Sequence, residues 1–106
     1  MTEHAVHKML ALYRAPDDID AFLDHYRSVH RPLVEKVPGL VRMELTRIDR
    51  TLIGEQGNFL LAEMLFADAE SLKAAVRSPE NAAAGADLGN FASGLVTVML
   101  GSPLDS

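Results

Sequence analysis

Two neighbouring segments decide the fold, residues 40–48 (LVRMELTRI) and residues 58–67 (NFLLAEMLFA). The first segment alternates apolar and polar side chains, a pattern typical of a β-strand. The second is also predicted to be a strand, and it is apolar on both faces except at Glu63. The stretch between them carries Gly54 and Gly57 and is expected to form a hairpin loop. The centre of the chain is therefore predicted to be an antiparallel pair of strands.

On the N-terminal side, residues 5–13 (AVHKMLALY) form an apolar run that predicts another strand. A turn follows, in which Asp17 or Asp18 can cap a helix. Apolar or aromatic side chains then recur at helical spacing at Ile19, Phe22, Leu23, Tyr26, Val29, His30 and Leu33. Pro32 disfavours the helical conformation for Arg31, so we expect this helix to break or kink there.

On the C-terminal side, Asp68 can cap a second helix, and Pro79 suits the first turn of a further helix expected over residues 81–91. Residues 95–100 (LVTVML) predict a fourth strand. The element order is β-α-β-β-α-β, which is the ferredoxin-like pattern of an α+β protein. Right-handed crossovers then place both helices on one face of a four-stranded antiparallel sheet. We expect residues 1–106 to form a single domain.

The side chains of the predicted sheet indicate self-association. Alternation places Phe59 on the face opposite Leu60, and neither face is polar enough to lie against water. Lys8 and Glu63 are expected to pair across strands rather than to form a catalytic network. Because a large exposed apolar face would aggregate, we expect a second copy to pack sheet against sheet, giving a homodimer.

Composition excludes several classes of function. The formal net charge is −5 and no basic cluster is present, which argues against nucleic acid and anionic membranes as partners. No cysteine is present, so disulfides, thiolate catalysis and cysteine-ligated metals are excluded, and a cytoplasmic location is expected. No signal peptide is expected, and no apolar run approaches the roughly 20 residues of a membrane span. Without a phosphate loop or metal signature, we expect neither a cofactor nor a bound metal.

Two residues of the first helix are candidate catalytic groups. His30 lies one turn beyond Tyr26 within the apolar stripe and close to the expected helix end, where it could transfer a proton or hold a ligand oxygen. The alternative is a structural histidine that bonds a backbone carbonyl freed by the break at Pro32. Tyr26 could donate its hydroxyl to a ligand carbonyl or polarise an enolate, or it could be an ordinary core tyrosine. His25 lies at the edge of the stripe and is expected to be solvated.

Four further residues are candidates for ligand binding. Tyr13 ends the first strand and could reach a cleft between sheet and helices, or the seam of a dimer. Asp87 in the last helix could line the same cleft, although a surface position is the default for an aspartate. The aromatic side chains of Phe22 and Phe91 complete the set.

The chain resembles the EthD-like proteins, named after ethyl tert-butyl ether degradation, through short motifs that follow one another over nearly its whole length. These motifs are Leu12-Tyr13-Arg14, His25-Tyr26-Arg27, His30-Arg31-Pro32-Leu33, Val37-Pro38-Gly39-Leu40, Ala62-Glu63, Phe66-Ala67-Asp68, Ser78-Pro79-Glu80 and Ala86-Asp87-Leu88-Gly89-Asn90-Phe91. The resemblance implies a dimeric α+β barrel in which two sheets face each other. It also implies a ligand cleft in each subunit between sheet and helices.

Function is left open among three hypotheses, because fold-level resemblance does not supply a reaction. In the first, a small apolar compound of aromatic or polyketide type undergoes cofactor-independent acid/base chemistry, as in an isomerase, cyclase or monooxygenase, with His30 and Tyr26 assisting. In the second, the protein is a non-catalytic, ligand-binding accessory component of a degradative pathway. In the third, it binds haem with His30 as axial ligand. The first ranks highest, because a titratable pair in an apolar cleft is costly unless it is used.

Overall fold

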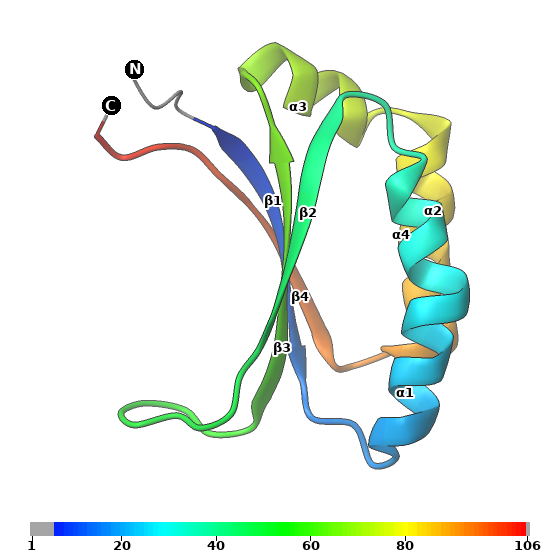
Figure 1. The fold of residues 1–106 in the computed structure, drawn as a ribbon, viewed down its shortest axis with the longest axis vertical. Helices are drawn as coiled ribbons and strands as arrows, with labels where there is room; N and C mark the ends of the chain where they lie inside the picture. Colours follow the sequence, from blue (N-terminus) through cyan, green and yellow to red (C-terminus); the bar gives the residue numbers. More distant parts are fainter. Residues whose placement is uncertain (1–5, 106) are drawn as a thin grey trace.

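The computed structural model describes residues 6–105 and contains one four-stranded antiparallel sheet (Figure 1). The strands are β1 (His7–Arg14), β2 (Leu40–Arg47), β3 (Asn58–Phe66) and β4 (Val96–Gly101). Their order across the sheet is β2-β3-β1-β4, with antiparallel pairing throughout. The predicted ferredoxin-like α+β fold is therefore confirmed. The strand ends differ by one or two residues from those expected, and residue 5 lies outside the described part of the chain.

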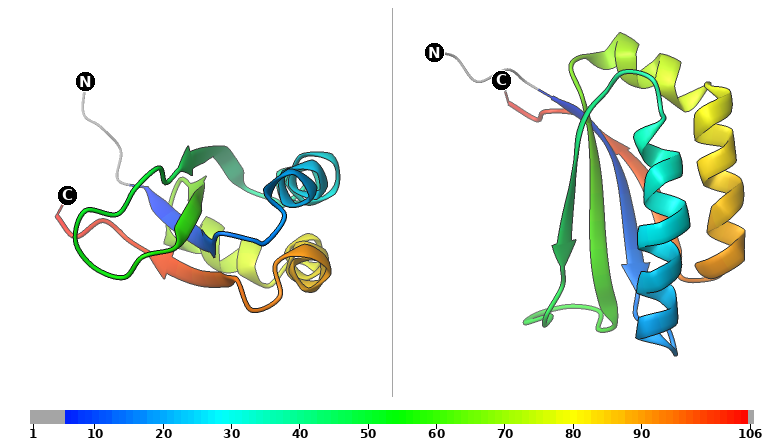
Figure 2. Two further views of the ribbon diagram at one scale, coloured as in Figure 1. Left: turned by 90° about the horizontal axis from the view of Figure 1, so that it is seen from below. Right: turned by 45° about the vertical axis from the view of Figure 1, so that its right-hand side comes forward.

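The helices pack on one face of this sheet (Figure 2). The first rod consists of α1 (Ile19–His25), the π-helical turn η1 (Tyr26–His30) and α2 (Arg31–Glu35). The second helical region consists of α3 (Ala69–Val76) and α4 (Pro79–Phe91). The two rods α1–α2 and α4 run side by side over the sheet, so any space between helices and sheet is walled by residues from both.

The helices begin where capping side chains stand in the sequence. Asp18 accepts a hydrogen bond from the backbone N–H of Ala21 at 3.0 Å, which caps α1. Asp68 caps α3 in the same way, and Ser78 caps α4 with Pro79 at the first helical position. Each cap satisfies a backbone donor that the helix itself leaves unpaired. The first residues of α1 and α3 agree with the caps predicted from the sequence, whereas α4 begins two residues before the expected residue 81.

Of the break or kink expected at Pro32, the break does not occur, because the helical rod continues to Glu35. The backbone N–H of Arg31 bonds to the carbonyl of Tyr26, five residues earlier, so the turn before the proline is π-helical. Pro32 has no N–H, and its ring crowds the preceding turn of an ordinary α-helix. The wider turn accommodates the proline without ending the helix. His30 is consequently in the middle of the rod and away from its C-terminal dipole.

A second correction concerns Phe59. Simple alternation put its ring opposite Leu60, on the face away from the helices, but the ring lies 5.7 Å from that of Phe22 on α1. The register shifts between Tyr13 and Arg14 of β1, where their partners on β3 are Leu60 and Asn58. This β-bulge adds one residue to β3 and breaks the two-residue alternation, so Phe59 and Leu60 are both buried.

The sheet face away from the helices carries the expected cross-strand pair, because Lys8 Nζ lies 2.9 Å from Glu63 Oε2. Leu10, Leu12 and Leu61 on the same face are only half-buried, and β2 adds the ion pair of Arg42 and Glu44, with Glu44 opposite Glu63. We call this face the open face. Among the helices of residues 6–105, none is long and apolar enough to cross a membrane.

Candidate functional site

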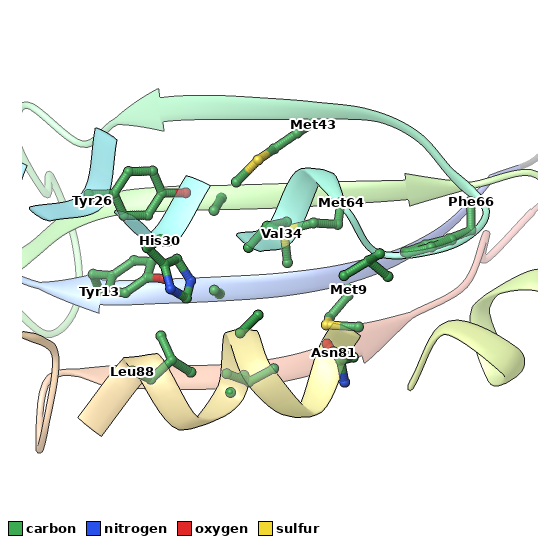
Figure 3. Close-up of a pocket in the computed structure, with 16 residues that line it drawn as sticks. Met9, Tyr13, Tyr26, His30, Val34, Met43, Met64, Phe66, Asn81 and Leu88 are labelled. Carbon is green, nitrogen blue, oxygen red and sulfur yellow. The ribbon is translucent and has the colours of Figure 1, made fainter. Parts of the chain in front are cut away.

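A cavity of about 130 Å³ lies between the sheet and the two helical rods (Figure 3). Its wall is mainly apolar and is built from small or flexible side chains, among them Met9, Ala11, Met43, Ala62, Met64 and Ala84. Alanine side chains are too short to fill the space between a sheet and a helix packed on it. Four polar side chains also reach the cavity: Tyr13, Tyr26, His30 and Asn81.

One end of this cavity is closed by a tightly packed aromatic cluster, made of Tyr13, Phe22, Tyr26, Phe59 and Phe91. The ring centroids of Phe22 and Phe91 are 5.1 Å apart, and those of Tyr13 and Phe22 are 5.4 Å apart in an edge-to-face arrangement. Such separations are those of favourable aromatic pairs. Tyr13 and Tyr26 belong to both the cluster and the cavity wall, so their hydroxyl groups are held by rigid neighbours.

His30 is fixed by Asp87 across the interface between the two rods. His30 Nδ1 lies 3.0 Å from Asp87 Oδ2, and both side chains are 5% exposed. Since a carboxylate can only accept, Nδ1 carries the proton and donates it in this bond. The other ring nitrogen, Nε2, is then left with a free lone pair on a residue that lines the cavity. This is the orienting carboxylate that the sequence near His30 lacks.

Asp87 is shared with a second histidine. His25 Nε2 lies 2.9 Å from Asp87 Oδ1, and Asn90 Nδ2 donates to the same oxygen at 3.0 Å. The expectation that His25 is solvated holds only in part, since its side chain is 28% exposed and its ring is hydrogen-bonded to Asp87. In a regular α-helix, residues five apart point well away from each other. The π-helical turn between His25 and His30 brings both rings to one carboxylate.

Burial and hydrogen bonding act in opposite directions on this group. Burial lowers the pKa of His30 and outweighs the opposing effect of the Asp87 hydrogen bond and charge, so the ring is neutral at pH 7. For Asp87, burial favours the protonated acid, but hydrogen bonds from Asn90, His25 and His30 prevail and lower its pKa. The pair is consequently a carboxylate and a neutral imidazole, which suits His30 to act as a base.

The two tyrosines remain protonated for the same physical reason. Burial raises the pKa of Tyr13 and of Tyr26 well above the usual phenol range. The Tyr26 hydroxyl is buried and has no hydrogen-bond partner within residues 6–105. Figure 3 shows it directed along the cavity toward Met43. An unpaired buried hydroxyl costs about 1–3 kcal/mol, which a bound acceptor would recover.

The histidine and carboxylate groups are arranged for hydrogen bonding rather than for metal binding. The distances from Asp87 oxygens to the ring nitrogens of His25 and His30 are 2.9–3.1 Å, which leaves no room for an ion between them. In the part of the chain that the structure describes, no group of three or more histidine or acidic side chains could hold a metal ion.

The candidates named from the sequence fall into two groups. Tyr13, Tyr26 and His30 line the cavity. Phe22, Asp87 and Phe91 do not line it, and instead support those that do: Asp87 through its hydrogen bonds, and the two phenylalanines through ring contacts. The residues that sequence reasoning missed are His25, whose role depends on the π-helical turn, and Asn81, whose spacing carries no signal.

The fold and this site define a small ferredoxin-like α+β protein with a cavity between its sheet and its helices. Residues 17–94 match the model of the EthD domain. An EthD family protein from Bacillus halodurans C-125 has a similar structure, with a TM-score of 0.85 and 42% identity over 93% of this chain and 99% of that one. The chain belongs to the EthD family.

Further relatives agree with this assignment. A protein of Rhodococcus erythropolis, described as an uncharacterised 11.0 kDa protein in the thcB–thcC intergenic region, is 34% identical over 94 residues, which are 89% of this chain and 91% of the relative.

Two more distant structures share the fold. A dimeric ferredoxin-like protein from Thermobifida fusca has a TM-score of 0.65 at 12% identity, covering 97% of this chain and 95% of that chain. SnoaB, a cofactor-independent oxygenase from Streptomyces nogalater, has a TM-score of 0.62 at 15% identity, covering 98% and 95%.

Proposed function

We propose that the cavity binds a small, largely apolar compound with a carbonyl group, and that His30 removes a proton from the carbon next to that carbonyl. The observation that carries this proposal is the buried Asp87–His30 hydrogen bond of 3.0 Å beside an apolar cavity. A general base must be neutral at working pH and held at a fixed position. The lowered pKa of His30 and its bond to Asp87 meet both requirements.

Tyr26 supplies the second part of the reaction. As the proton leaves carbon, the electron pair of the C–H bond moves toward the carbonyl oxygen, which becomes an enolate. The protonated and unpaired hydroxyl of Tyr26 donates a hydrogen bond to this oxygen, and Tyr13 offers a second donor in the same wall. Donors that are already in place where charge develops lower the barrier, because they need no reorganisation.

The enolate bound in this way has three possible fates. Reprotonation at another carbon gives isomerisation, attack on a second carbonyl of the same molecule gives cyclisation, and reaction with dioxygen gives oxygenation. In each case the proton removed from carbon resides on His30 Nε2, while Nδ1 keeps its bond to Asp87. SnoaB, which shares the fold, is a cofactor-independent oxygenase, and this supports the third fate as one member of the set.

The size of the cavity limits the ligand. A closed cavity of roughly 150 Å³ holds a benzene ring, and the cavity here measures about 130 Å³. A single substituted ring fits this space, because the methionine side chains in its wall can adjust. Haem is much larger than this space, so the cavity does not support haem binding.

The test is proton exchange at carbon, with small ketones that carry a phenyl ring, such as phenylacetone, as probes. The protein is incubated with the probe in D₂O, and loss of the C–H signal next to the carbonyl is followed by proton NMR. We expect exchange above the buffer rate, a loss of that excess in His30→Ala, and a reduction of about 10²-fold or more in Tyr26→Phe. His7→Ala, which changes a histidine outside the cavity wall, is the matched control and should retain exchange.

Exchange separates catalysis from simple binding. Probes that bind without exchange would favour the accessory, non-catalytic function. If none of these ketones either binds or exchanges, the proposed function is wrong.

We also propose that the chain forms a homodimer through the open face. Half-buried Leu10, Leu12 and Leu61 support this, as does the dimeric state stated for the Thermobifida fusca protein of the same fold. Apolar surface of this kind is covered in stable proteins. Light scattering at micromolar concentration should give twice the mass of the chain. Leu12→Lys should shift the protein to monomer, and a wild-type monomer would contradict the proposal.

A further inference from the structure

A single buried carboxylate joins two histidines, of which the proposed reaction uses only one. Asp87 Oδ1 accepts from His25 Nε2 and Asn90 Nδ2, and Asp87 Oδ2 accepts from His30 Nδ1. The ring of Phe91, one helical turn beyond Asp87, lies 4.8 Å from the ring of His25 and 4.9 Å from that of His30. The two imidazoles are therefore held against the same two side chains of α4.

The two histidines differ in their access to water. The side chain of His25 is 28% exposed, whereas those of His30 and Asp87 are each 5% exposed. Removing an imidazolium from water costs free energy, and the cost rises with burial. One carboxylate balances one positive charge. When this group takes up a proton, the charge is therefore more stable on the outer ring, next to Asp87 and in contact with solvent.

We infer that His25 is a positioning residue. It lies at the solvent edge of the His25–Asp87–His30 group and carries the positive charge when the group takes up a proton. His30 thereby remains a neutral base. His25 also donates to both oxygens of Asp87, at 2.9 and 3.1 Å, which fixes the plane of the carboxylate so that Oδ2 faces His30 Nδ1. The catalytic meaning of this role rests on the proposed function, but the charge distribution itself does not.

The surroundings of His30 contain few other groups that could carry a positive charge next to Asp87. Asp87 comes from α4, Tyr26 from the same turn and Tyr13 from β1. Both tyrosines stay uncharged because burial raises their pKa. Besides His30, His25 is the described side chain that can carry a positive charge in direct contact with Asp87. A charged His25 lowers the pKa of His30, in the same direction as burial does.

The chain also holds two permanently or usually charged residues near this part of the rod, Arg31 and Glu35. They lie 3.5 Å from each other at the surface of α2. Their opposite charges act in opposite directions on the pKa of Tyr26. Neither side chain is hydrogen-bonded to Asp87, whose partners among the described residues are His25, His30 and Asn90.

The experiment is an NMR titration of the imidazole nitrogens in the full chain labelled with ¹⁵N, which needs no substrate. In the wild type, we expect the His25 ring to become charged before His30 as the pH is lowered, with His30 in the Nδ1–H form while neutral. In His25→Gln, which keeps a neutral donor but cannot be charged, His30 should take up its proton at a pH higher by on the order of one unit.

Asn90→Leu is the matched control, because it removes a neutral donor from the same oxygen of Asp87. It should move the His30 titration much less than His25→Gln does. The inference is overturned if His30 becomes charged first in the wild type, or if His25→Gln leaves the His30 titration unchanged. Failure of the proposed function would appear separately, as an absence of carbon–hydrogen exchange with His30 titrating as described.

Discussion

The aromatic cluster and the cavity occupy the same layer between sheet and helices, yet one is filled and the other is hollow. The cluster packs five rings at centroid distances such as 5.1 and 5.4 Å. Beside it, alanines such as Ala11, Ala62 and Ala84 leave about 130 Å³ unfilled. The fold is the same across both regions, so the difference comes from side-chain volume alone. The filled region stabilises the protein, and the hollow region is the site of the proposed ligand.

The catalytic candidates stand at the border of these two regions. Tyr26 has its ring in the cluster and its hydroxyl in the cavity, and His30 packs against Tyr26 and Phe91 while lining the cavity. A group at such a border is held rigidly on one side and is open to a ligand on the other. This arrangement is the one that preorganised sites require.

The largest expected effect is on the filled region. Phe22→Ala removes a buried ring that contacts four other rings of the cluster, and should lower the free energy of unfolding by about 3–5 kcal/mol in urea denaturation. Met64→Ala, in the cavity wall, should cost only about 2 kcal/mol, because its side chain already borders empty space. Equal losses for the two variants would remove the distinction between a filled and a hollow region.

A smaller loss is expected at the border itself. Asp87→Ala leaves the Nδ1 of buried His30 without an acceptor and frees His25, and should cost about 2–3 kcal/mol of unfolding free energy. Asp24→Ala, which changes an exposed aspartate of α1, serves as the control and should stay within about 0.5 kcal/mol of the wild type. A neutral outcome for Asp87→Ala would mean that the carboxylate does not hold the histidines.

Tyr26→Phe should have the opposite sign. It removes a buried hydroxyl without a partner and keeps the ring in the cluster, so the free energy of unfolding should rise by about 1 kcal/mol. The same change should weaken ligand binding, because the hydroxyl is the proposed donor to the ligand. Thermal unfolding without a ligand measures the change in stability, and thermal unfolding with a cavity ligand measures the change in binding. A loss of stability in the free protein would show that the hydroxyl is already satisfied.

The smallest effect is the dependence of stability on pH. The pKa of His30 is lowered on folding, so the unfolded chain binds more protons than the native protein below about pH 6.5. This contribution to stability is complete above that pH and is lost as the pH falls through the native pKa. The urea midpoint of the wild type should therefore be lower at pH 5.5 than at pH 7.5, and this difference should be smaller in His30→Gln. An equal difference in the variant would mean that a group other than His30 causes the pH dependence.

Local patterns predicted the filled framework well. The alternation in residues 40–48 and the capping residues Asp18 and Asp68 act over a few positions, and the strands and helices lie where they indicate. The structure departs from these patterns where an extra residue interrupts the regular period of a helix or a strand. The π-helical turn before Pro32 carries the helix past the expected break, and the bulge at Phe59 turns its ring to the helices.

The site was predictable only in part. Tyr26 and His30 are four residues apart, so helical spacing is enough to place them together. Asp87 lies 57 residues from His30 and 62 from His25, and no local rule connects such positions. The hollow itself depends on the summed volumes of side chains from several elements, which become neighbours only once the sheet and helices have packed.

The most direct test of the account is whether a small carbonyl compound enters the cavity. Met9, Met43 and Met64 line it, whereas Met99 lies on β4 outside its wall. Their methyl groups, labelled with ¹³C, report occupancy during a titration with phenylacetone. The account predicts saturable shifts for the three cavity methionines, none for Met99, and weaker binding in His30→Ala. Unchanged cavity signals, or equal shifts at all four methyl groups, would contradict it.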